Sequence, residues 1–116
     1  MDANLTLRGQ GELQRAYQQE ARLYNELKED SPGDEMLGHG AGILAALDWV
    51  LGSTETSPLS GETGVDVTDP EMLDRERRPA SRMLRGEESM DARGRQYVSG
   101  VETALMWAVG LSDTPL

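Results

Sequence analysis

The chain contains an internal repeat, and this repeat restricts its fold more than any other feature of the sequence. The stretch GILAALDWVLGSTET at 42–56 and the stretch GVETALMWAVGLSDT at 100–114 share six of fifteen aligned residues. The offset between them is 58 residues, which is half of the 116-residue chain. Because a single helical hairpin cannot bury its apolar face alone, the two copies are expected to pack against each other.

The repeated residues are the types that two closely packed helices require. In each copy a glycine and an alanine lie four positions apart, so both share one helix face and let another helix approach. A leucine and a tryptophan beside that face supply apolar area to be buried. The predicted helix-packing residues are Gly42, Ala46, Leu47 and Trp49 in the first copy, and Gly100, Ala104, Leu105 and Trp107 in the second.

The repeat predicts an all-α fold of about four helices, arranged as two repeated helix–turn–helix units in a single domain, 1–116. Residues 1–11 are expected to form a flexible arm, although the alternation of Leu5 and Leu7 also suits a short extended segment. The two predicted units and the linker loop between them are 12–59, 60–67 and 68–116.

Apolar spacing and capping residues predict where the helices begin and end. Three helices are predicted over 12–29, 34–51 and 90–109, the last with Ser89 as its cap. Another helix is predicted to begin at a Thr68–Glu71 capping box and to kink or divide at Pro79. Glycines that suit a left-handed C-terminal cap follow three of these helices, namely Gly52, Gly86 and Gly110.

The repeated motif G-x-x-x-A-L-x-W-x-x-G is followed in both copies by an acidic turn that contains threonine and proline. With this pattern the chain resembles small uncharacterised helical proteins of high-GC bacteria and their phages. Residue usage points to the same source, since ten of the eleven basic residues are arginine. The resemblance implies no activity and no site residues.

Charge is distributed unevenly along the chain. The net charge is −10, with −11 over residues 1–74, +3 over 75–95 and −2 over 96–116. An acidic protein repels nucleic-acid phosphates, so direct nucleic-acid binding is disfavoured. A protein partner with a basic or nucleic-acid-binding surface is favoured instead, while the ordinary alternative is that the charge serves solubility.

The residue inventory disfavours several classes of site. The chain has no cysteine and one histidine, so neither a disulfide nor a zinc site is expected, and no cofactor motif is present. The acids within 66–74 lack the spacing and the glycine of a calcium-binding EF-hand loop. No segment has the length of a membrane span and no secretory signal is seen, which predicts a cytoplasmic protein.

The single histidine, His39, stands between Gly38 and Gly40 just before the first repeat. A phosphate-binding loop would need a preceding strand and a nearby lysine, and the sequence predicts neither there. In the second copy the place of His39 is taken by Tyr97, which favours helix packing over catalysis. We therefore predict no catalytic residue and no enzyme activity.

Arginines recur along the helix predicted to begin at Thr68, at spacings that place them on one side of it. Such a row can grip a phosphate or an acidic protein surface, or neutralise the chain's own acids within a monomer or across a homodimer. Self-neutralisation is favoured because the rest of the chain is acidic. The row consists of Arg75, Arg78, Arg82 and Arg85.

The function predicted from these observations is a non-enzymatic protein–protein interaction module, such as an inhibitor, antitoxin-like or anti-defence protein of a phage or mobile element. Its acidic surface would bind a basic surface of a larger partner, with charge attraction speeding association. The alternatives are a self-associating homodimer and, less favoured, a small-ligand or phosphate binder that uses the arginine row. The acids predicted to bind the partner are Glu26, Glu29, Asp30, Glu55 and Glu62.

Overall fold

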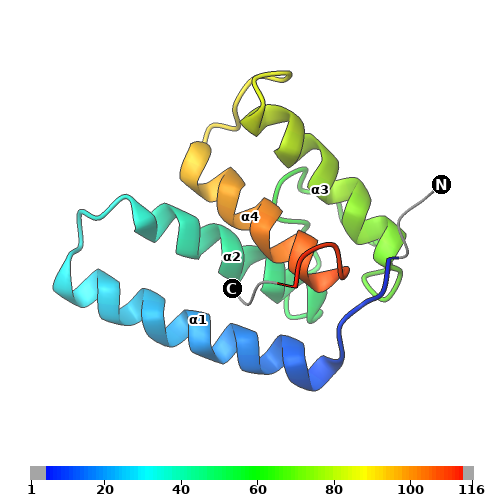
Figure 1. The fold of residues 1–116 in the computed structure, drawn as a ribbon, viewed down its shortest axis with the longest axis horizontal. Coiled ribbons are helices and arrows are strands. Elements are labelled where there is room, and N and C mark those ends of the chain that lie inside the picture. Colours follow the sequence, from blue (N-terminus) through cyan, green and yellow to red (C-terminus); the bar gives the residue numbers. More distant parts are fainter. Residues whose placement is uncertain (1–4, 114–116) are drawn as a thin grey trace.

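The computed structural model describes residues 5–113, which contain four α-helices and no strand (Figure 1). In chain order the helices are α1 (Gln10–Asp30), α2 (Met36–Val50), α3 (Pro70–Leu84) and α4 (Arg95–Ala108). α1 packs on α2, α3 packs on α4, and α2 packs on α4 between them. The predicted all-α class with four helices is confirmed.

α2 and α4 meet backbone to backbone at two glycines that correspond in the repeat. A Cβ atom added to Gly42 would overlap the carbonyl oxygen of Tyr97, and one added to Gly100 would overlap the carbonyl oxygen of His39. The same 58-residue offset relates Tyr97 to His39 and Gly100 to Gly42. Since any side chain larger than hydrogen would push the backbones apart, these glycines set the distance between the two helices.

The two copies of the repeat correspond where α2 crosses α4, but the segments that join the helices differ. α1 and α2 are joined by the short segment 31–35, whereas α3 and α4 are joined by the longer segment 85–94. The arrangement of the whole chain as two repeated helix–turn–helix units therefore remains a prediction.

The core lies where the four helices meet and combines aliphatic side chains with two tryptophans. Leu13 of α1 and Leu73 of α3 enter the main cluster, and α2 and α4 supply most of its other members. A smaller cluster of Leu59, Ala80 and Val98 joins the loop before α3 to α3 and α4. All eight predicted helix-packing residues are buried: Gly42, Ala46, Leu47, Trp49, Gly100, Ala104, Leu105 and Trp107.

The cap that begins α3 is Asp69, not Thr68. The carboxylate of Asp69 accepts a hydrogen bond from the N–H of Glu71 at 3.0 Å. Thr68 instead donates its hydroxyl proton to Asp66, in the turn before the helix. The predicted capping box is thus corrected by one residue, because the carboxylate of Asp69 both accepts a hydrogen bond and interacts favourably with the helix dipole.

Pro79 does not divide α3, and Ser89 does not cap α4. α3 continues through Pro79 without division. Pro79 has no N–H to donate to the carbonyl of Arg75, but Arg75 is exposed, so water can replace the missing hydrogen bond. α4 begins at Arg95 after Gly94, whose φ of 97° favours glycine, so Ser89 is not its cap. The predicted C-terminal glycines are left-handed, each with a φ of 79°, at Gly52, Gly86 and Gly110.

The segment before α1 is extended, as the alternation of Leu5 and Leu7 indicated, and it is held against the end of α4. The N–H groups of Thr6 and Arg8 donate to carbonyl oxygens at that end, each at 3.0 Å. The Arg8 guanidinium also lies 4.8 Å over the ring of Trp107. These contacts, and a helix that begins at Gln10, correct the predicted flexible arm, of which residues 1–4 lie outside the described range.

Candidate functional site

The connection between α1 and α2 concentrates negative charge at one end of the molecule, on the left in Figure 1. Five acids and one base, Lys28, lie within residues 26–35, and residues 28–36 are exposed without interruption. None of the five acids takes part in any ion pair found within residues 5–113. We name this region the acidic corner, and its carboxylates belong to Glu26, Glu29, Asp30, Asp34 and Glu35.

The acidic corner includes charges that weaken the fold locally. Glu26, Glu29 and Asp30 lie in the last five residues of α1, where the free carbonyl groups already make the helix end negative. An acid there costs about 0.3–1 kcal/mol at low ionic strength. Only Asp34 has a clear structural use, because it accepts a hydrogen bond from the N–H of Met36 at 2.8 Å. Charges placed against local stability are typical of functional surfaces.

Two large apolar side chains are exposed beside the acidic corner. Leu23 is 45% exposed and Met36 is 48% exposed, and they are the two exposed large hydrophobic residues in the described part of the chain. Leu23 lies one helical turn before the corner on α1, and Met36 follows it at the start of α2. Exposed apolar groups rimmed by charge are a common feature of protein-binding surfaces.

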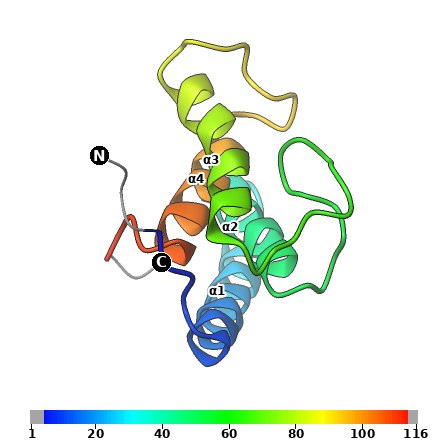
Figure 2. The same cartoon turned by 90° about the vertical axis from the view of Figure 1, so that its right-hand side faces the viewer.

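The other two acids predicted to bind a partner lie elsewhere. Glu55 and Glu62 belong to the loop 51–69, which follows α2 and projects beside α2 and α3 (Figure 2). The acidic corner precedes α2, and this helix of 15 residues is about 22 Å long. The five predicted acids therefore do not form one surface, and only Glu26, Glu29 and Asp30 lie together.

The arginine row of α3 is largely neutralised by the chain's own acids. Three of its members form ion pairs with nitrogen–oxygen distances between 2.5 and 3.1 Å, namely Arg78 with Asp74, Arg82 with Glu88, and Arg85 with Glu87. The exception is Arg75, whose guanidinium donates to the sulfur of Met72 at 3.6 Å and has no recorded carboxylate partner within residues 5–113. The pairs support the interpretation of this row as self-neutralising.

A buried polar network that sequence analysis missed links α3 to α4. Asp74 is 5% exposed and accepts hydrogen bonds from Arg77 at 2.8 Å and Arg78 at 3.1 Å. Arg77 also donates to Ser81, whose hydroxyl donates to Glu102 of α4. These bonds satisfy the buried groups and hold α3 against α4.

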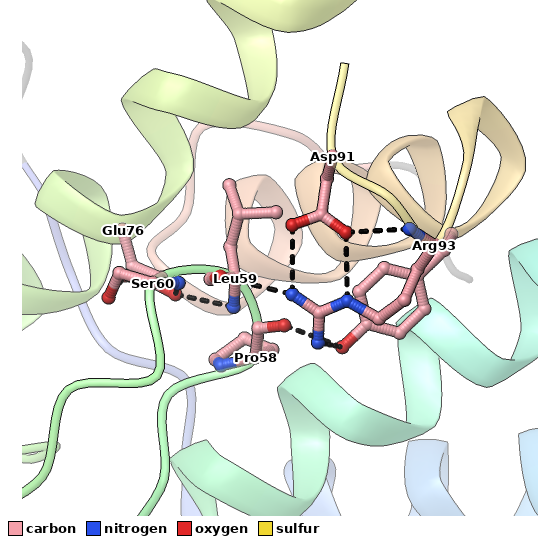
Figure 3. A network of polar contacts seen from close by, with 7 residues as sticks. Pro58, Leu59, Ser60, Glu76, Asp91 and Arg93 are labelled. Carbon is pink, nitrogen blue, oxygen red and sulfur yellow. Dashed lines mark hydrogen bonds and ion pairs between the residues drawn. The ribbon is translucent and has the colours of Figure 1, made fainter. Parts of the chain in front are cut away.

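Glu76 holds the loop 51–69 to α3. Its carboxylate is nearly buried and accepts hydrogen bonds from the Leu59 N–H at 2.6 Å and the Ser60 N–H at 2.8 Å (Figure 3). The Ser60 hydroxyl donates to the second oxygen at 2.7 Å. Three donors on one carboxylate stabilise its charge without a cation, so this part of the loop is fixed.

Arg93 and Tyr97 hold the same part of the loop from the side of α4. Arg93 donates to the Leu59 carbonyl at 3.0 Å, and the Tyr97 hydroxyl donates to the Pro58 carbonyl at 2.6 Å (Figure 3). Burial raises the pKa of Tyr97, so its hydroxyl keeps the donated proton. Asp91 orients Arg93 at 2.8 Å, and the hydrogen bond from Arg93 lowers the pKa of Asp91.

His39 of α2 has its backbone against α4, where its carbonyl oxygen lies beside Gly100, and its charge acts on Glu20 of α1. Burial raises the pKa of Glu20 on α1, and the charge of His39 partly opposes this effect. A Cβ on Gly40 would come within 3.1 Å of the Tyr24 ring, and one on Gly38 would come equally close to a side chain of α4. The glycines on both sides of His39 therefore allow close packing of α2, as the packing interpretation proposed.

Within residues 5–113, no three His, Asp or Glu side chains gather so that they could hold a metal ion. None of the described helices combines the length and the hydropathy that crossing a membrane requires. Comparisons with protein-family models, curated proteins and solved structures found no match. The resemblance to helical proteins of high-GC bacteria and their phages therefore stays a prediction.

Proposed function

We propose that the chain is a non-enzymatic interaction module whose acidic corner binds a basic surface of a larger protein in the cytoplasm. The observation that carries this proposal is the combination, at one end of the molecule, of exposed carboxylates outside any recorded ion pair and two exposed apolar side chains. A partner with basic residues around an apolar groove complements both. Occupying such a surface would inhibit a partner that binds nucleic acid, as an antitoxin-like or anti-defence protein would.

The two kinds of side chain have different tasks in this proposal. Leu23 and Met36 lose apolar exposure on binding, which supplies affinity at about 25 cal/mol per Å² of buried area. The carboxylates raise the association rate and make it depend on salt. A basic partner also relieves the repulsion at the end of α1, so binding would stabilise the folded chain.

A homodimer that pairs the arginine row with the acids of a second copy has less support. Three of the four arginines already pair with carboxylates of their own chain. A second copy would have to break these pairs, which returns little because surface ion pairs contribute about 0–1 kcal/mol.

The proposal is tested with a labelled helical peptide of lysine and leucine that carries its leucines on one face. The triple variant Glu26→Gln, Glu29→Gln, Asp30→Asn should bind it at least about tenfold more weakly than the unaltered protein, a change of about 1.4 kcal/mol. The matched control Glu55→Gln, Glu62→Gln, Asp113→Asn also removes three negative charges, but outside the acidic corner, and should change affinity less than about twofold. Fluorescence anisotropy measures both, and equal weakening would mean that net charge alone attracts the peptide.

The apolar part of the site is tested separately. Replacing Leu23 and Met36 by serine should weaken binding of the lysine–leucine peptide and leave binding of a lysine–glycine peptide unchanged. Equal affinity of the serine variant and the unaltered protein for the lysine–leucine peptide would remove both side chains from the proposed site.

A further inference from the structure

A hollow of about 390 Å³ lies between α3 and residues 60–66, which we name the strap. Met72, Arg75, Glu76 and Pro79 line it from α3, and Trp49 of α2 also borders it. These four positions follow the i, i+3, i+4, i+7 spacing of one helix face. The volume falls in the range of about 300–1,000 Å³ that is usual for pockets that bind small molecules.

The hollow exists because the strap stands away from α3. Thr63 and Gly64 are small residues on the wall of the hollow, and Gly61 and Gly64 both adopt a positive φ with no atom within 4 Å of an added Cβ. Glu76 fixes the start of the strap through Ser60, and the turn between Asp66 and Thr68 holds its end. A second hollow of about 530 Å³ adjoins the first, since it shares Trp49 and strap residues 63–66.

The hollow carries charges of both signs that are not paired with each other. Arg75 lies on the α3 wall and is the one member of the arginine row without a recorded ion pair within residues 5–113. Glu62 and Asp66 lie on the strap wall, and no ion pair is recorded for either. Hydrogen bonds from Thr68 lower the pKa of Asp66, so this carboxylate is ionised at neutral pH.

We propose that this hollow binds a small zwitterion with an apolar side chain, of the amino-acid type. The ligand carboxylate would pair with Arg75, and the ligand ammonium group would pair with Glu62 and Asp66. Val65, Met72 and Pro79 offer apolar contacts to its side chain. A simple anion would meet the two strap carboxylates and a simple cation would meet Arg75, so a ligand with both charges fits best. This proposal does not depend on the acidic corner.

The test uses three probes of similar shape: L-leucine, leucinamide, which lacks the carboxylate, and 4-methylpentanoate, which lacks the ammonium group. Backbone ¹H–¹⁵N shifts of residues 60–66 and 72–79 report binding. L-leucine should shift these resonances and bind at least about tenfold more tightly than either single-charge probe. No shift with L-leucine at millimolar concentration, or equal affinity for all three probes, would overturn the proposal.

Variants then assign the charges to the two walls. Arg75→Gln should weaken L-leucine binding at least about tenfold without weakening leucinamide binding, because leucinamide has no carboxylate to pair with Arg75. Glu62→Gln should weaken L-leucine binding without weakening binding of 4-methylpentanoate, which has no ammonium group. The control is Arg15→Gln, which removes an exposed arginine of α1 that does not line the hollow. Arg75→Gln and Arg15→Gln variants that bind L-leucine equally well would contradict the assignment.

Discussion

In α3 the acids Asp69 and Glu71 stand at the beginning of the helix and the arginines Arg82 and Arg85 at its end, which is the order that the helix dipole favours. In α1 the order is reversed, since the end of the helix carries Glu26, Glu29 and Asp30. Arg82 and Arg85 are also paired within the chain, whereas the acids at the end of α1 take part in no ion pair found within residues 5–113. The charges of α3 therefore stabilise the fold, whereas those at the end of α1 are available to bind a partner.

The largest effect is expected where α2 crosses α4, because this contact joins α1 and α2 to α3 and α4. Gly42→Ala should lower the free energy of unfolding by about 3 kcal/mol or more, because the new Cβ would collide with the carbonyl of Tyr97. Urea denaturation followed by circular dichroism measures it. Gly33→Ala is the control, since a Cβ there meets no atom within 4 Å. A loss below about 1 kcal/mol would show that the helices can separate easily.

Replacing the buried carboxylate of Glu76 on α3 should give the next largest effect. Glu76→Gln should cost about 2 kcal/mol, because the neutral amide loses the charge and one of the two acceptor oxygens that receive hydrogen bonds from Leu59 and Ser60. Amide hydrogen exchange at these two residues should accelerate along with the loss of stability. The exposed Glu71→Gln variant should leave that exchange unchanged, and the same acceleration in both variants would remove Glu76 as the anchor of the loop.

Neutral substitutions of acids at the end of α1 and at the beginning of α3 should change the free energy of unfolding in opposite directions. Glu29→Gln with Asp30→Asn should raise the free energy of unfolding by about 0.3–1 kcal/mol per site, whereas Glu71→Gln in the first turn of α3 should lower it by a similar amount. Thermal unfolding at low ionic strength measures both, and high salt should shrink both. Destabilisation by the α1 pair would mean that its acids serve the fold.

The smallest predicted effect is the pH dependence of the contact between α1 and α2. Burial raises the pKa of Glu20 in the folded state, so its favourable contribution is full below the unfolded pKa and is lost as the pH rises through the folded pKa. Glu20→Gln should therefore stabilise the protein near neutral pH, by less than about 1 kcal/mol, and lose this advantage in acid. Because burial is the main cause, His39→Gln should leave the direction of the dependence unchanged. Since the charge of His39 opposes the effect of burial, a reversed dependence in that variant would contradict burial as the cause.

The sequence predicted the centre of the fold well because its determinants are local. Gly42 and Gly100 can be recognised from the repeat, and three C-terminal glycines mark helix ends through a conformation that other residues rarely adopt. The starts of α3 and α4 were missed by one and by several residues, since several side chains near each start could serve as a cap.

The loop network could not be predicted from sequence. Glu76 and Ser60 are 16 residues apart, and Tyr97 and Pro58 are 39 residues apart, so their contacts depend on the completed packing of α3 and α4. In the sequence Glu76 is one acid among the arginines of a helix, and nothing near it indicates a buried charge.

The acidic corner was predicted only in part. Its acids at the end of α1 were identified, but their separation from Glu55 and Glu62 follows from the length of α2. Leu23 carried a usable signal, because it lies outside the apolar stripe formed by Leu13, Tyr17 and Tyr24. The exposure of Leu23 could therefore have been predicted from the spacing of the apolar residues.

We propose that the acidic corner is the partner-binding surface. Mapping of backbone ¹H–¹⁵N shifts during a titration tests this proposal directly. The unaltered protein is titrated with the helical lysine–leucine peptide, and each amide between residues 5 and 113 reports whether the peptide binds near it. We expect the largest shifts within residues 23–37, and we expect them to diminish when salt is added. Largest shifts in the loop 51–69 or along α3, with residues 23–37 unmoved, would contradict it.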